Sequence, residues 1–173
     1  MSIKDLDQKE DVKLALETFA RNPQGFLMLS GTNGTGKTYA AMEVYKRVTP
    51  FVLPSYDHDI AIFITQAELN LWWIKTTKDD VDATHLLKSL TKCKLLVLDD
   101  LGTRTPSDAF MDFLYLIADK RWNARKVQGT IITTNLNSAD LRAKFTDAFF
   151  SRVASGKNFR IEGKDRRFKP VEF

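Results

Sequence analysis

Short apolar runs alternate along the chain with segments that have helical periodicity. From Asp5 to Arg21 the apolar residues recur at about helical spacing, which predicts a lead-in helix that ends at the Asn-Pro pair of residues 22–23. Mostly apolar runs predict buried strands at 26–29, 60–64, 95–98, 129–133 and 159–161. The segments between them predict helices at 39–47, 66–75, 84–90, 107–125 and 138–152. This alternation predicts an α/β fold in which helices cover both faces of a five-stranded parallel sheet.

Thr65 and Glu68 predict where the helix after the second strand begins. The Thr65 hydroxyl can accept a hydrogen bond from the Glu68 N–H, while the Glu68 carboxylate reaches back to the Thr65 N–H. This reciprocal capping box favours a helix that starts at Gln66.

Residues 31–38, Gly-Thr-Asn-Gly-Thr-Gly-Lys-Thr, lie between the first predicted strand and the next helix and fit the phosphate-binding pattern G-x-x-x-x-G-K-[ST]. The glycines let the backbone curl so that N–H groups point at anionic oxygens, and the helix adds its positive N-terminal end. Lys37 can then reach the β- and γ-phosphates, and the Thr38 hydroxyl can hold Mg²⁺. The alternative is a glycine-rich turn, but the flanking strand and helix favour a nucleotide site. Its predicted nucleotide-binding residues are Asn33, Gly34, Thr35, Gly36, Lys37 and Thr38.

Two acids, Asp99 and Asp100, end the third predicted strand. Ligands of parallel sheets bind at the carboxyl ends of the strands, so these acids belong beside the phosphate loop. We expect Asp99 to face Mg²⁺ and Asp100 to orient and polarise the attacking water. An Asp after a strand can also begin a turn, and the Leu-Gly pair at 101–102 fits that alternative. The nearby phosphate loop favours the functional interpretation.

Asn135 and Arg152 are further candidates for the chemistry. Asn135 follows the fourth predicted strand, where it could hold the attacking water, although Asn is also common at strand ends. Arg152 ends the following helix and could neutralise transition-state charge from a neighbouring subunit, although a lone arginine is more often a solvated surface residue.

Composition narrows the remaining possibilities. A chain of 173 residues with 43% hydrophobic and 28% charged residues suits one globular domain. It has no apolar run long enough for a membrane span or a signal peptide, and its single cysteine, Cys93, excludes an internal disulfide, so we expect a cytoplasmic protein. The net charge of +4 is compatible with a nucleic-acid partner and equally with a merely solvated basic surface.

Taken in order, these motifs resemble the AAA+ ATPase module of the DnaC/DnaI helicase loaders, which the transposon-encoded IstB ATPases share. The resemblance is carried by 31–38, by Asp-Asp-Leu-Gly at 99–102, by Thr-Thr-Asn at 133–135 and by Ser-Arg-Val at 151–153, and it extends from about residue 26 to 167. It implies an AAA+ P-loop NTPase core at 26–173 without a helical lid domain, after a lead-in helix within 1–25. Helicase loaders also carry an N-terminal domain that grips the helicase, whereas only about twenty-five residues precede the first strand here. Contact with a helicase would then use the lead-in helix, and the alternative is that the chain is a short ATPase module.

The resemblance implies a role for each matching residue. Lys37 and Thr38 correspond to Walker A residues, Asp99 and Asp100 to the Walker B pair, and Asn135 to sensor 1. Arg152 corresponds to an arginine finger that acts across a subunit interface, which implies self-assembly. Arg167, in a Gly-x-x-x-Arg sequence, corresponds more weakly to a second γ-phosphate sensor. The implied ligands are ATP and Mg²⁺.

The segment 65–92 takes the place of the part that lines a single-stranded DNA path in this family. Trp72, Lys75 and Lys78 combine an aromatic ring with cations, as base stacking and phosphate contact require, although Trp72 and Trp73 could simply belong to the core. The implied function is DNA-stimulated ATP hydrolysis in helicase loading, with single-stranded DNA and a replicative hexameric helicase as partners. The alternatives are an IstB-like transposition regulator on duplex DNA, a small-molecule P-loop kinase, and an adaptor that binds ATP without hydrolysing it.

Overall fold

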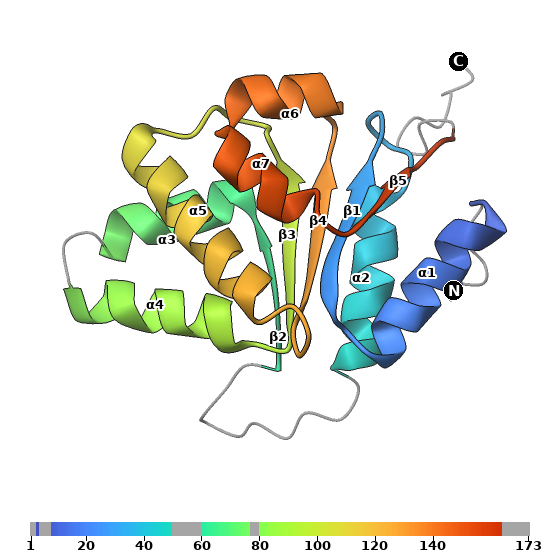
Figure 1. Cartoon of the computed structure of the whole chain (residues 1–173), viewed down its shortest axis with the longest axis horizontal. Coiled ribbons are helices and arrows are strands. Elements are labelled where there is room, and N and C mark those ends of the chain that lie inside the picture. The colour runs from blue at the N-terminus through green and yellow to red at the C-terminus, as the bar shows by residue number, and fades with distance from the viewer. Residues whose placement is uncertain (1–2, 4–7, 50–59, 77–79, 164–173) are drawn as a thin grey trace, which may run out of the picture.

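A parallel five-stranded sheet with the strand order β2-β3-β4-β1-β5 forms the centre of the molecule (Figure 1). The computed structural model describes residues 3, 8–49, 60–76 and 80–163, and the side chains of these residues except those of 80–82. The strands are β1 (Gly25–Ser30), β2 (Ala61–Thr65), β3 (Leu95–Leu101), β4 (Gly129–Thr134) and β5 (Lys157–Arg160). The predicted α/β fold with a five-stranded parallel sheet is confirmed.

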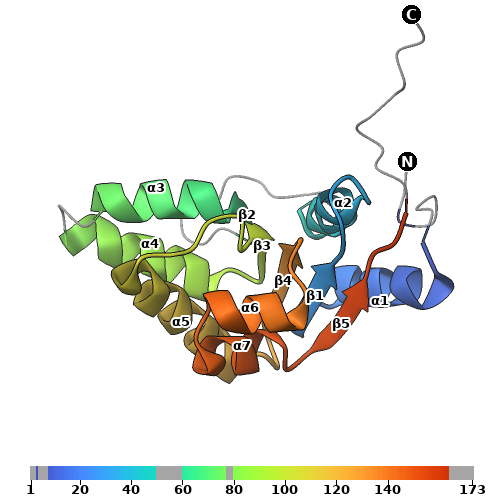
Figure 2. The ribbon, with the colours of Figure 1, turned by 90° about the horizontal axis from the view of Figure 1, so that it is seen from above.

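Helices cover both faces of the sheet (Figures 1 and 2). One face is covered by α1 (Glu10–Arg21) and α2 (Lys37–Val48), and the opposite face by α3 (Gln66–Thr76), α4 (Asp80–Lys92), α5 (Asp108–Asn123) and α7 (Asp147–Val153). The short helix α6 (Ser138–Lys144) lies at the carboxyl ends of the strands. None of the helices in the described part of the chain is both long and apolar enough to cross a bilayer.

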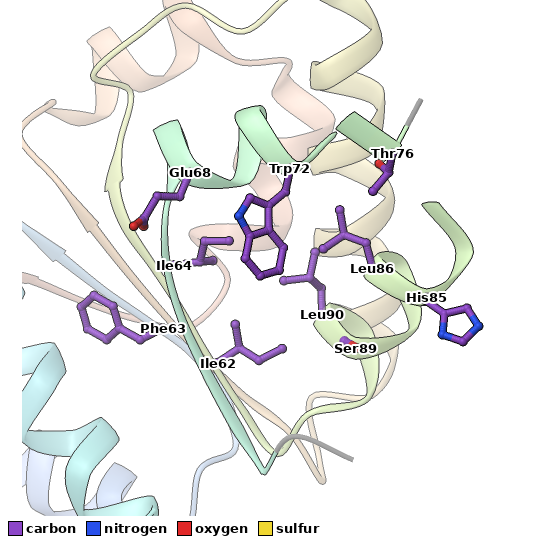
Figure 3. Close-up of a pocket in the computed structure, with 10 residues that line it drawn as sticks. All are labelled: Ile62, Phe63, Ile64, Glu68, Trp72, Thr76, His85, Leu86, Ser89 and Leu90. Carbon is purple, nitrogen blue, oxygen red and sulfur yellow. The ribbon is translucent and has the colours of Figure 1, made fainter. Parts of the chain in front are cut away.

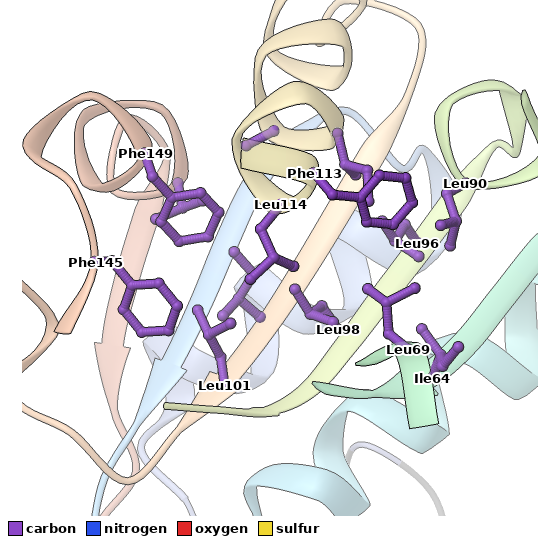
Figure 4. Packing of buried hydrophobic residues seen from close by; sticks show 14 of the residues in the cluster. Ile64, Leu69, Leu90, Leu96, Leu98, Leu101, Phe113, Leu114, Phe145 and Phe149 are labelled. Atoms are coloured by element: carbon purple, nitrogen blue, oxygen red, sulfur yellow. The ribbon is translucent and has the colours of Figure 1, made fainter. Parts of the chain in front are cut away.

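Successive residues of the central strands enter two separate hydrophobic clusters. In β1, Phe26 and Met28 join the cluster beneath α5 and α7, whereas Leu27 and Leu29 join the cluster beneath α1 and α2. Figure 4 shows part of the larger cluster, in which Leu114 of α5 points toward the sheet. Because both faces are buried, these strands are continuously apolar in sequence instead of alternating with polar residues.

The segment 138–152, predicted as one helix, contains two. The backbone leaves the helical conformation at Phe145 (φ −123°, ψ 159°), and the Phe145 ring is buried and stacks on Phe149 at 5.1 Å between centroids. Thr146 then starts α7, because its hydroxyl accepts a hydrogen bond from the Phe149 N–H at 3.2 Å. The helical spacing of the apolar residues continues across this break, which explains why the pattern predicted a single helix.

The capping box before α3 is confirmed. The Thr65 N–H donates to Glu68 Oε2 at 2.9 Å, and the Glu68 N–H donates to Thr65 Oγ1 at 3.1 Å. The hydrogen bonds from Thr65 lower the pKa of the Glu68 carboxyl below its ordinary value.

A buried arginine ties the amino ends of β3 and β4 to α4 and α5. Arg121 is 1% exposed, and its guanidinium donates to the carbonyls of Leu90, Cys93 and Gly129, and also to Thr130 Oγ1 at 2.7 Å. Burial lowers the pKa of Arg121. Its hydrogen-bond acceptors are neutral, so this is a structural clamp instead of an ion pair.

Candidate functional site

The phosphate loop, residues 31–38, connects β1 to α2 and is shaped by glycines with positive φ. Gly31 has φ 146°, and a Cβ there would lie 2.2 Å from the Ile161 carbonyl oxygen, so no other residue fits. Gly36 has φ 97° in the left-handed region, directly before α2. Within the loop, Thr35 is buried and donates to the Thr32 carbonyl at 2.9 Å, whereas Asn33 is exposed.

The Lys37 ammonium lies over this loop. Its Nζ donates to the carbonyl oxygens of Gly31 at 2.9 Å and of Thr32 at 2.7 Å, and the side chain is buried. A cation is thus held at the mouth of a curled backbone, next to the start of a helix. This arrangement attracts an anion.

The N-terminus of α2 differs from those of α5, α6 and α7. In α5, α6 and α7, side chains of Ser107, Asn137 and Thr146 cap the helix, and each first turn contains an acidic residue. In α2, Gly36 offers no capping side chain and the first turn contains no acid. The first N–H groups of an α-helix have no intrahelical acceptor, so this end of α2 is suited to bind phosphate oxygens.

Asp99, at the carboxyl end of β3, joins the phosphate loop to the neighbouring strand. Thr38 Oγ1 lies 3.0 and 3.1 Å from its two carboxylate oxygens, and Thr133 Oγ1 donates to Oδ1 at 2.5 Å. Burial raises the pKa of the Asp99 carboxyl above its ordinary value of 3.8, while the hydrogen bonds from Thr133 and Thr38 oppose this shift. The charge of Asp100 raises the pKa further and that of Lys37 lowers it. A buried carboxylate beside a threonine hydroxyl is the donor set that Mg²⁺ uses together with phosphate oxygens.

A bulge in β3 presents Asp100 differently from Asp99. The register with β4 shifts between Leu98 and Leu101, and Asp100 adopts φ 54°, the one positive φ among described residues other than glycine. Its N–H donates to Thr133 Oγ1 at 2.9 Å, and its side chain is half-buried. β3 therefore continues past the predicted end at residue 98 and holds both acids within the strand, in conformations that differ.

Three further side chains at this end of the sheet were given no role in the site from the sequence, although Thr133 belongs to the Thr-Thr-Asn sequence at 133–135. The Thr133 hydroxyl bridges the Asp99 carboxylate and the Asp100 N–H, while Gln66 and Lys144 hold the peptide of Gly102. A polar residue that ends the strand next to Asp99 could have indicated Thr133. Nothing in the local pattern indicated Gln66 or Lys144, since their partners are 36 and 42 residues away in the sequence.

Asn135 lies near the acids, whereas Arg152 belongs to a different part of the chain's surface. β4 runs between β1 and β3, so Asn135, the residue after it, is exposed between the phosphate loop and the bulge. The Arg152 Nε and Nη2 donate to Asp119 Oδ1 at 3.1 and 3.0 Å, and its guanidinium lies 5.3 Å from the Tyr115 ring centre. Within one chain, Arg152 thus has partners on α5 and is not brought to the phosphate loop.

The two tryptophans of α3 have different environments. Trp73 stacks on Phe113 of α5 at 4.4 Å between centroids, whereas Trp72 is 55% exposed. Figure 3 shows Trp72 above a pocket of about 430 Å³ between α3, α4 and β2, with Ile64 and Leu90 among its walls. Lys75 is exposed on the same helix. Two predicted site residues, Lys78 and Arg167, lie outside the described residues.

In the described part of the chain, no group of three or more His, Cys, Asp or Glu side chains is arranged to hold a metal ion. Thr38 and Asp99, whose side chains lie 3.0–3.1 Å apart, are oxygen groups next to the phosphate loop that could contact a cation. Mg²⁺ often has one or two carboxylates, with phosphate oxygens and water completing its shell, and the pair fits that pattern.

A family model described as IstB-like ATP binding protein matches residues 2–154 of the chain. Among curated protein sequences, none matches significantly.

Solved structures of replication proteins share the fold. The DnaC helicase loader is 25% identical, with a TM-score of 0.73 over 93% of this chain and 96% of that one. DnaI is 22% identical, with a TM-score of 0.70 over 92% of this chain and 89% of that one. DnaA from Aquifex aeolicus, bound to AMPPCP, is 14% identical, with a TM-score of 0.78 over 93% of this chain and 49% of that one. The chain thus spans about half the length of this DnaA structure and of a second one bound to AMPPCP and single-stranded DNA.

Proposed function

The chain belongs to the family of IstB-like ATP-binding proteins, and we propose that it hydrolyses ATP as a helicase-loader-type AAA+ protein on single-stranded DNA. The contact of Thr38 with Asp99, beside the uncapped N-terminus of α2, carries the ATPase part of this proposal. The match to the DnaC helicase loader, which extends over 96% of that chain, supports the loader part. A replicative hexameric helicase is the proposed protein partner.

Nucleotide binding uses the phosphate loop. Its backbone N–H groups and the first turn of α2 bind the phosphate oxygens. Lys37 gives up its hydrogen bonds to the carbonyls of Gly31 and Thr32 and binds the β- and γ-phosphates instead. Thr38 and Asp99 would hold Mg²⁺, which would neutralise charge on the phosphates. The open space around Gly36, where an added Cβ would meet no atom within 4 Å, is consistent with this cradle.

Hydrolysis uses the residues at the end of β3 and β4. Asp100 accepts a hydrogen bond from the attacking water and polarises it, while Asn135 fixes the water beside the γ-phosphate. The different conformations of the two acids support a division of labour, since Asp99 is buried and bonded and Asp100 is half-buried in a bulge. Lys37→Ala should abolish nucleotide binding, and Asp100→Asn should permit binding but slow turnover.

Arg152 acts in trans in this proposal, which requires self-assembly. To reach a neighbour's γ-phosphate, its guanidinium has to leave Asp119, and the ion pair is only partly buried, with side chains 29% and 31% exposed. Such pairs contribute about 0–1 kcal/mol, so the exchange is feasible. Unchanged DNA-dependent turnover in Arg152→Ala would remove Arg152 from this role.

Single-stranded DNA binds along α3 in this proposal. Trp72 provides an exposed ring on which a base stacks, and Lys75 provides a cation for the phosphates. Lys78 follows α3 in the sequence and is the third proposed contact, as Arg167 is a further proposed contact to ATP.

ATP turnover without DNA, with single-stranded DNA and with duplex DNA, at one fixed salt concentration, tests the proposal. Stimulation mainly by single strands supports the loader function. Turnover that neither form of DNA stimulates contradicts the DNA assignment, and loss of all turnover in Lys37→Ala shows that the measured activity belongs to this site.

A second candidate is a transposition regulator that binds duplex DNA. The description of the matching family as IstB-like favours it, because the IstB ATPases are encoded by transposons. Stimulation mainly by duplex DNA in the same experiment identifies this function and excludes the loader.

A further inference from the structure

Side chains from two helices hold the Gly102 peptide, two residues after Asp100. The Gly102 N–H donates to Gln66 Oε1 of α3 at 2.7 Å, and the Gly102 carbonyl accepts from Lys144 Nζ of α6 at 2.7 Å. Gly102 has φ 90°, and a Cβ there would lie 2.3 Å from Leu136 Cδ1. The peptide is therefore confined on three sides by groups that come from elsewhere in the sequence.

Gln66 is the more constrained of the two clamping residues. It is 4% exposed and is the first residue of α3. The other end of its amide, Nε2, donates to the Arg104 carbonyl at 2.9 Å, so both ends of the side chain bind the segment after β3. A buried amide that loses such partners incurs a penalty of about 1–3 kcal/mol, so Gln66 and this segment are expected to move together.

Gln66 and Lys144 together form a clamp on Gly102. This clamp matters because few other contacts hold the backbone of Asp100. Its N–H binds Thr133 and its carbonyl accepts from Thr103, but its side chain emerges from a bulge with φ 54°. The direction of such a side chain follows the backbone on either side of it. A displacement of about 1 Å in a group that orients a reactant can reduce a rate by about 100-fold.

Gln66 also belongs to the helix that carries Trp72. The two residues are six positions apart, or about 9 Å along the axis of one helix. Trp73 holds this helix in place by stacking on Phe113 of α5 at 4.4 Å between ring centroids. A shift of α3 as a rigid element thus reaches Gly102 through Gln66.

We propose that Gln66 and Lys144 are positioning residues for Asp100, and that Gln66 transmits the binding of single-stranded DNA on α3 to this carboxylate. The second half rests on the proposed function, whereas the first half requires only that Asp100 takes part in hydrolysis. In this arrangement DNA does not touch the nucleotide site. It changes the turnover number by moving one hydrogen-bonded peptide.

The test compares Gln66→Met and Lys144→Met with the wild-type chain. The variants are measured for ATP affinity, single-stranded DNA affinity, and turnover with and without DNA. Glu68→Ala is the matched control, because it removes the capping box of the same helix without touching Gly102. Lys144→Arg keeps a cationic donor for the Gly102 carbonyl and serves as the rescue variant. Gln66→Asn, whose shorter amide cannot reach both partners, replaces Gln66→Met if that variant does not fold.

We expect Gln66→Met to bind ATP and DNA as the wild type does, while its DNA-stimulated turnover number falls by roughly 10- to 100-fold. The ratio of stimulated to basal turnover should approach one in this variant and stay at the wild-type value in Glu68→Ala. Lys144→Met should lower both basal and stimulated turnover, and Lys144→Arg should restore them. A wild-type stimulation ratio in Gln66→Met, or an equal loss in Glu68→Ala, overturns the transmission by Gln66.

Failure of the proposed function gives a different result. If single-stranded DNA does not stimulate the wild-type chain, both the DNA part of the proposed function and the transmission by Gln66 are refuted. The clamp is then judged by basal turnover alone. A lower turnover number with unchanged ATP affinity in Gln66→Met and Lys144→Met supports it, and an unchanged turnover number refutes it.

Discussion

Replacing Thr133 with valine tests whether one hydroxyl holds both acids at the end of β3. Thr133 is 0% exposed, and its Oγ1 donates to Asp99 Oδ1 and accepts from the Asp100 N–H at 2.9 Å. Valine has nearly the same shape, so the substitution removes these two hydrogen bonds without leaving a cavity.

The expected loss of stability follows from the two bonds. A hydrogen bond to a charged carboxylate contributes about 1.5–3 kcal/mol, and the partly buried Asp100 N–H, left without a partner, incurs at most about 1–3 kcal/mol. Since the two effects overlap, we expect Thr133→Val to lower the free energy of unfolding by about 2–4 kcal/mol at neutral pH. A domain of this size has about 5–15 kcal/mol, so the variant should still fold.

The effect of Thr133→Val on stability should depend on pH. Burial holds the folded-state pKa of Asp99 above its ordinary value of 3.8, and the bond from Thr133 opposes this, so its removal raises that pKa further. A carboxyl with a raised pKa stabilises the fold when it is protonated, and this contribution is lost as the pH rises through the folded-state pKa. The destabilisation should therefore be smaller near pH 3.8 and increase toward neutral pH.

Urea unfolding at a series of pH values measures this dependence, with Thr133→Ser as the control. Serine keeps the hydroxyl and loses one buried methyl group, which should cost about 0.8 kcal/mol at every pH. If Thr133→Val and Thr133→Ser lose the same stability with the same pH dependence, the hydroxyl does not hold the two acids and the reasoning is wrong.

Three other substitutions test separate parts of the structure. Arg121→Met should lower the free energy of unfolding by about 3–5 kcal/mol in urea titrations, because it leaves several buried acceptors unpaired. Lys120→Met, on the exposed side of α5, should change it by no more than about 0.5 kcal/mol. Equal values for the two variants would contradict the structural role of Arg121. Asp99→Asn should raise the free energy of unfolding without nucleotide by about 0.5–2 kcal/mol at neutral pH, because it removes a buried charge. It should also abolish ATP turnover. A melting temperature below that of the wild type would contradict the first expectation. Trp72→Ala should weaken binding of a single-stranded oligonucleotide by about 1–3 kcal/mol in anisotropy titrations, whereas Leu71→Ala, equally exposed but outside the pocket, should not.

The fold and the core of the candidate site could be predicted because their determinants are local. The phosphate loop is contiguous, and the acids directly follow an apolar run, so the neighbourhood of Thr38 and Asp99 needs only the rule that parallel strands end at one edge. The break at Phe145 was missed because burial of its ring depends on contact with the next helix, which the spacing of apolar residues does not contain.

The choice between Trp72 and Trp73 shows the same limit of local patterns. Adjacent helical residues point about 100° apart, so the sequence requires different environments for the two rings. Which ring packs inward is decided by Phe113, about forty positions away, on a different helix. Gln66 is a similar case, because a polar residue after a capping threonine is ordinary until its two distant carbonyl and N–H partners are known.

The sheet carries opposite buried charges at its two ends, with Arg121 near the amino ends of the central strands and Asp99 at a carboxyl end. Four residue steps along β3, about 13 Å, lie between Leu95 and Asp99, so the two charges cannot pair. Arg121 is compensated permanently by carbonyl dipoles, whereas the penalty at Asp99 can be relieved by a bound cation. If a cation binds there, it should stabilise the folded state by about 2.7 kcal/mol at a ligand concentration of 100 times Kd. The melting temperature would then report what fraction of the protein has a cation bound at Asp99.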